Sequence, residues 1–92
     1  STYRDDALYE LGNMYVSQNN NDQAIAAYDK LVRDLPGSSY VSKALLKKAL
    51  ILDNNNNSDE ALRILRGVAA DYPGTPEALQ AVTTAKLIYI DF

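Results

Sequence analysis

The chain has 92 residues, 47% of them hydrophobic, and a formal net charge of −3 from 9 basic and 12 acidic residues. This length allows a single domain with one modest core, and the charge gives no positive field that would attract a nucleic-acid backbone. The sequence contains no cysteine and no histidine. Disulfides, thiolate nucleophiles, imidazole bases and the usual ligands of zinc are therefore excluded.

Targeting and membrane segments are not evident. The start of the chain, Ser1 to Asp6, has neither an initiator methionine nor the apolar core of a signal peptide. We therefore expect the sequence to be a piece of a longer protein. No apolar run approaches the length of a membrane span, so direct membrane insertion is not expected.

Hydrophobic periodicity predicts an all-α fold of five amphipathic helices. The expected helices cover residues 3–18, 22–35, 39–53, 59–72 and 76–91. In the first, the apolar stripe consists of Leu8, Leu11, Gly12 and Tyr15. In the second, it consists of Ala24, Ala27, Tyr28, Leu31 and Leu35.

The predicted helices are separated by residues that end or start helices. Asparagine runs at 19–21 and 54–57 favour turns. Proline and glycine follow the second and fourth helices at 36–37 and 73–74, and Ser38 or Thr75 can cap the helix that comes next. Pro76 after Thr75 is a further start signal, because proline suits the first helical position.

The five residues 34–38, Asp-Leu-Pro-Gly-Ser, return at 71–75 as Asp-Tyr-Pro-Gly-Thr. Displacing the chain by 37 residues aligns small residues with small and large with large at many positions, such as Ala24 with Ala61 and Leu31 with Val68. A fixed period of this size indicates a stacked array of repeats. The expected units cover residues 5–41 and 42–78, followed by a terminal helix at 79–92.

The repeat resembles the tetratricopeptide repeat, a helix-turn-helix unit with large, small and aromatic residues at fixed spacings. The first unit carries this pattern in Leu8, Leu11, Gly12, Tyr15, Ala24, Tyr28, Leu31 and Pro36. The second unit follows it, except that Lys48 stands where a large apolar residue is expected. The resemblance implies a right-handed α-solenoid of antiparallel helix pairs, with about two and a half units in five helices.

The 37-residue period resembles a narrower group. Pro-Gly-Ser-x-Tyr at 36–40, together with Asp-Asp-Ala-Leu-Tyr-Glu-Leu-Gly at 5–12, is similar to repeats of bacterial cell-envelope proteins. These include the outer-membrane assembly lipoprotein and the periplasmic cell-division coordinator of the Tol-Pal system. The resemblance implies a periplasmic or outer-membrane-associated setting.

The resemblance also implies a function in protein binding. In such arrays the first helix of each unit lines a concave surface that binds a peptide or a partner protein. The positions that match are Tyr9, Asn13, Val16, Lys43, Leu46, Leu50, Gln80, Thr83 and Leu87. Alternatively, the repeats are structural spacers between other domains, and the leucines pack against a neighbouring repeat.

Catalytic and metal-binding interpretations have little support. Asp53, Asn55, Asn57 and Asp59 alternate as in a calcium loop, but Ser58 and Ile64 replace the required glycine and glutamate. With no histidine or cysteine to activate a hydroxyl, we expect no enzyme activity and no cofactor. Tyr15, Tyr28 and Tyr89 lie on helical stripes, which places them in the core.

Two packing predictions complete the analysis. We expect Gly12 and Ala24 to meet at a close helix crossing, as Ala49 and Ala61 do in the second unit. In the last helix, Leu87, Ile88, Tyr89 and Ile90 cannot all face one side. At least two of them are therefore expected to remain exposed, near Phe92, and to leave an apolar end through which the chain either self-associates weakly or meets another repeat or domain of a longer protein.

Overall fold

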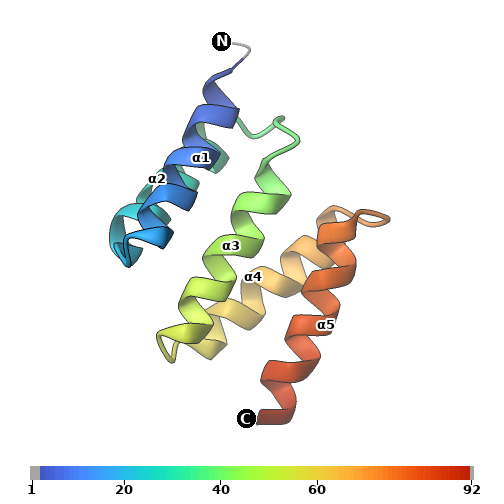
Figure 1. The fold of residues 1–92 in the computed structure, drawn as a ribbon. Helices are drawn as coiled ribbons and strands as arrows, with labels where there is room; N and C mark the ends of the chain where they lie inside the picture. The colour runs from blue at the N-terminus through green and yellow to red at the C-terminus, as the bar shows by residue number, and fades with distance from the viewer. Residues whose placement is uncertain (1–2, 92) are drawn as a thin grey trace. The chain divides into compact units, whose positions relative to one another are not determined.

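The computed structural model describes residues 3–91, except for the side chain of Asp91, and consists of five helices (Figure 1). They are α1 (Arg4–Ser17), α2 (Asn21–Asp34), α3 (Val41–Asn54), α4 (Ser58–Asp71) and α5 (Pro76–Asp91). Every bound lies within two residues of the predicted one, and the all-α fold is confirmed. None of the described helices is long and apolar enough to cross a membrane.

The structure divides into two compact units, one that ends at Ala44 and one that begins at Leu45. In the first unit α1 packs against α2. The buried face of α2 consists of Ala24, Ala27, Tyr28 and Leu31, which confirms most of the predicted stripe. On α1 only Gly12 is fully buried, because the large residues of its stripe are covered from one side and stay half-buried.

The second unit has a core shared by three helices. Its buried members are Leu46 and Ala49 from α3, Ala61, Ile64, Leu65 and Val68 from α4, and Ala81 and Ile88 from α5. Ala49 and Ala61 are both completely buried, and their expected contact stays a prediction. Burial of this apolar surface is the main source of the unit's stability.

The first helix of each pair ends in the same turn. Asn19 and Asn56, which are 37 residues apart, have positive φ angles of 59° and 65°. The next amide in each case, that of Asn20 or Asn57, donates to a carbonyl five residues back at 2.8 Å. This is the Schellman arrangement, in which a left-handed residue closes the helix end. Asparagine tolerates that conformation better than other residues with a side chain, which explains the asparagine runs.

The two Pro-Gly turns differ despite their similar sequences. Gly74 has a φ of +81°, the left-handed conformation that glycine adopts freely, whereas Gly37 does not. Thr75 caps α5 as predicted, because its Oγ1 accepts a hydrogen bond from the amide of Ala78 at 3.1 Å. Ser38 instead accepts from the amide of Tyr40 at 3.0 Å, so α3 begins two residues later than expected.

Replacing Thr75 with alanine is expected to lower the free energy of unfolding by about 1 kcal/mol, the usual loss when a cap hydroxyl is removed. Urea unfolding followed by circular dichroism measures the change. Thr75→Ser keeps the acceptor oxygen and serves as the control. If alanine and serine variants were equally stable, the cap would contribute nothing.

The space beside Gly12 in the first unit is filled by Tyr28, and the expected contact of Gly12 with Ala24 stays a prediction. A Cβ added to Gly12 would lie 2.3 Å from Cε1 of Tyr28, and its next two neighbours are also ring atoms of Tyr28. The residue nearest to Gly12 is therefore Tyr28, one turn beyond Ala24 on α2. The Tyr28 ring fills the space that the missing side chain leaves.

Candidate partner-binding site

Two of the residues predicted to bind a partner in the first unit, Tyr9 and Asn13, contact buried Tyr28. The ring of Tyr9 has its centroid 6.1 Å from that of Tyr28 and 5.1 Å from that of Tyr40. Asn13 accepts a hydrogen bond from the Tyr28 hydroxyl at 2.5 Å. Tyr9 and Asn13 are both half-buried, so each has one side in the core of the unit and one side toward solvent.

Burial raises the pKa of Tyr28 to about 12. Because the neutral form is favoured in the folded chain, the stability that this group contributes is complete below its unfolded pKa of about 10. It is lost as the pH rises from there toward 12. We therefore expect the last tyrosine ionisation in an ultraviolet titration to occur near pH 12, and that last step to disappear in Tyr28→Phe.

Polar contacts hold the start of α1 against the turn before α3. The hydroxyl of Ser38 donates to Oδ2 of Asp5 at 2.5 Å, and this hydrogen bond lowers the pKa of the Asp5 carboxyl. A hydrogen bond with Asp6 raises the pKa of Tyr40. Val16 and Lys43, the other predicted binding residues of this unit, are half-buried.

In the second unit the structure separates the predicted residues. Leu46 is only 6% exposed and belongs to the core, so its side chain is not on the expected surface. Leu50 is half-buried, whereas Gln80 and Thr83 are exposed. Leu87 is 59% exposed. The last three are spaced by three and four residues and therefore share one face of α5.

The C-terminal helix exposes more apolar surface than the prediction required. Leu87, Tyr89 and Ile90 are exposed, while Ile88 is buried, which confirms that at least two of the four remain in solvent. The core position assigned to Tyr89 is wrong, since this side chain is 70% exposed. Phe92 lies outside the described residues.

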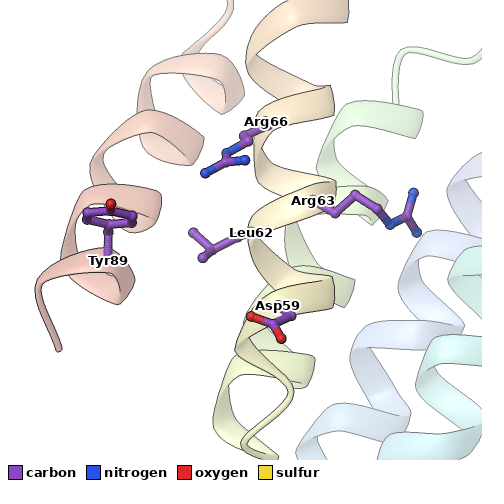
Figure 2. Close-up of a pocket in the computed structure, with 5 residues that line it drawn as sticks. All are labelled: Asp59, Leu62, Arg63, Arg66 and Tyr89. Carbon is purple, nitrogen blue, oxygen red and sulfur yellow. The ribbon is translucent and has the colours of Figure 1, made fainter. Parts of the chain in front are cut away.

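A groove between α4 and α5 was not predicted as a site. At one end it is lined by Asp59, Leu62, Arg63 and Arg66 of α4 and by Tyr89 of α5 (Figure 2). A neighbouring hollow of about 400 Å³ shares Leu62, Arg66 and Tyr89 with it. The sequence indicated an uncovered stripe on α5 but gave no sign of the wall that α4 contributes.

A comparison with protein families now identifies the repeat. The model for the tetratricopeptide repeat matches residues 6–38 and again residues 43–75. These segments make up more than half of the chain. The chain belongs to the tetratricopeptide repeat family. The second matched segment includes Lys48, so a lysine at the position of a large apolar residue does not prevent this segment from matching the family model. None of the curated proteins compared with the chain is significantly similar to it.

Membership of the tetratricopeptide repeat family gives the functional class. Repeats of this family generally mediate protein–protein interactions and are typically not catalytic. In this tetratricopeptide chain the exposed residues Gln80, Thr83 and Leu87 lie on α5, which follows the second matched repeat. They are the predicted binding positions most open to solvent.

Proposed function

We propose that this tetratricopeptide chain is a protein-interaction scaffold that binds a peptide or partner protein through the first helices of its units. The exposed face of α5 formed by Gln80, Thr83 and Leu87 carries the proposal. It combines an amide, a hydroxyl and an apolar side chain that is more than half exposed. Such a mixed surface suits a helical or extended peptide. In this proposal the chain acts by binding and not by catalysis.

A photo-crosslinking residue in place of Leu87 tests the proposal in cells that produce the full natural protein. Ala70 of α4 is exposed, lies on the second helix of its unit and lines no part of the groove between α4 and α5, so it provides the control. We expect a discrete adduct with another protein from position 87 and not from position 70. Crosslinks only within the same chain would support the spacer function instead, and no adduct at 87 would contradict the scaffold.

The proposed setting is the bacterial cell envelope, in the periplasm or at the outer membrane. Its support is the Pro-Gly-Ser-x-Tyr segment at 36–40 combined with the 37-residue period. In the structure Tyr40 of this segment packs on Tyr9, so the segment has a defined structural role. Alkaline phosphatase fused to the full natural protein is active only after export. An inactive, stably produced fusion would contradict an envelope setting.

We further propose weak self-association through the exposed end of α5. Sedimentation velocity over a wide concentration range is expected to show a sedimentation coefficient that rises with concentration. Leu87→Ser with Ile90→Ser should abolish the rise, because both side chains are largely exposed. Ile88 is unsuitable for this test because it is buried. A constant coefficient in the parent chain would contradict self-association.

A further inference from the structure

The groove between α4 and α5 extends along most of both helices. The hollow of about 400 Å³ continues at the other end of α4 into a second one, with which it shares Ala69 and Val82. Its lining extends from Asp59 to Pro73 on the α4 side. At 1.5 Å per helical residue this distance is about 20 Å. The groove is therefore as long as a helix of about four turns.

The repeat indicates what kind of element fits the groove. Leu45 and Leu52 of α3 pack against the core of the second unit. The residues 37 positions later, Val82 and Tyr89 of α5, line the groove and are 40% and 70% exposed. The face that α3 uses to pack in a helical core is thus repeated on α5, where no described helix covers it. A helix is the element that matches this face.

A basic residue distinguishes this face from those of α1 and α3. The equivalent position is Gly12 in α1 and Ala49 in α3, and both are buried. In α5 it is Lys86, which is exposed and lines the groove. A helix over Lys86 would have to lie farther from α5 than α2 lies from α1, since the Tyr28 ring of α2 occupies the space beside Gly12. The lysine ammonium group would then reach the edge of that helix.

Arg66 supplies a second cation on the opposite wall. In Figure 2 its side chain extends from α4 toward α5, whereas Arg63 points away from Tyr89 and pairs with Glu60. Within the described side chains of residues 3–90, neither Arg66 nor Lys86 has an ion pair. The central hollow of the groove is otherwise lined by Leu, Ala, Val, Ile and Tyr, and Asp59 and the paired Arg63 line only one end of the groove. One cation therefore stands on each side of an apolar floor.

We propose that this groove binds an amphipathic helix of a partner protein, with an apolar stripe and acidic residues on both of its flanks. Carboxylates on the flanks would pair with Arg66 and Lys86 while the stripe covers Val82 and Ala85. A second copy seated groove to groove fits poorly, because it would bring four cations together. Gln80, Thr83 and Leu87 do not line the groove, so it differs from the partner-binding face proposed above. The groove shares Ile90 with the residues proposed for self-association.

Two synthetic peptides of four helical turns test the proposal. They share one leucine stripe and carry either glutamates or lysines on both flanks. Titrated into the nitrogen-15-labelled chain, the glutamate peptide is expected to shift the amides of Val82, Lys86 and Tyr89 saturably. Two exposed ion pairs should make it bind about 2- to 30-fold more tightly than the lysine peptide. This preference should decrease at high salt.

Charge reversal provides the decisive comparison. In the variant Arg66→Glu with Lys86→Glu, the preference should change to the lysine peptide. Lys47→Glu reverses the charge of an exposed residue of α3 that does not line the groove. This variant should keep the preference for the glutamate peptide. Circular dichroism confirms that each variant is folded.

Three results would overturn the proposal. One is equal affinity for the two peptides. Another is a preference that survives the double reversal. The third is a parent chain that binds neither peptide but forms a dimer that the double reversal abolishes, which would make a second copy the occupant.

Discussion

Tyr28→Ala is expected to lower the free energy of unfolding by about 3–5 kcal/mol, the range for truncating a large buried aromatic side chain. The ring of Tyr28 is completely buried, covers Gly12 and contacts Tyr9. Truncation would leave a cavity between α1 and α2 that neither helix can fill, because Gly12 has no side chain. Urea unfolding followed by circular dichroism measures the change.

Tyr28→Phe is the matched control for this truncation. It keeps the ring and removes only the hydroxyl that donates to Asn13 at 2.5 Å. The expected loss is about 0.5–1.5 kcal/mol, the net contribution of one hydrogen bond. If phenylalanine were as destabilising as alanine, the hydrogen bond rather than the ring would hold the two helices together.

The helices could be predicted because several local signals agreed. Apolar spacing, the Pro-Gly segments and the cap at Thr75 all indicated the same boundaries. The conformations of the turns could not be predicted in the same way. Gly37 and Gly74 stand in nearly identical sequences, yet only Gly74 is left-handed. The left-handed residues at the other helix ends, Asn19 and Asn56, are asparagines within polar runs that indicate a turn without specifying which residue changes conformation.

The candidate site was less predictable because a helical pattern does not say which neighbours are present. Leu46 was expected on the binding surface, but it lies in the core that α3, α4 and α5 form together. Tyr89 was expected in the core because of its stripe position, and it is exposed because no described helix covers that side of α5. The period identified the equivalent positions correctly. Burial at those positions depends on the next element in the array.

Gly12→Leu is expected to destabilise the chain by about 1–3 kcal/mol, the usual cost of overpacking a filled core. Even the first added carbon would lie 2.3 Å from the Tyr28 ring, so the ring or α1 would have to move. Leucine has a better helix propensity than glycine by about 1 kcal/mol, which opposes the loss but does not cancel it. Urea unfolding again gives the measurement, and a variant as stable as the parent would refute the contact.

A substitution at Gly67 shows the effect of helix propensity alone and is therefore a control for substitutions at Gly12, where packing also changes. It lies inside α4, and a Cβ added there would have no neighbour within 4 Å. Gly67→Ala is therefore expected to stabilise the chain by up to about 1 kcal/mol, whereas Gly12→Ala should destabilise it. If Gly12→Ala and Gly67→Ala changed the free energy of unfolding in the same direction, a steric conflict with Tyr28 would not determine the effect of a side chain at position 12.

The double variant Gly12→Leu with Tyr28→Ala tests whether the stability lost in Gly12→Leu is lost through contact with the Tyr28 ring. Once the Tyr28 ring is removed, the leucine side chain can enter the space that the ring occupied, because the Gly12 Cβ and the ring compete for one volume. The double variant should be more stable than the sum of the single losses predicts, by about 0.5–3 kcal/mol, the range of coupling for residues in contact. Strict additivity would mean that the leucine destabilises α1 by a route other than collision with Tyr28.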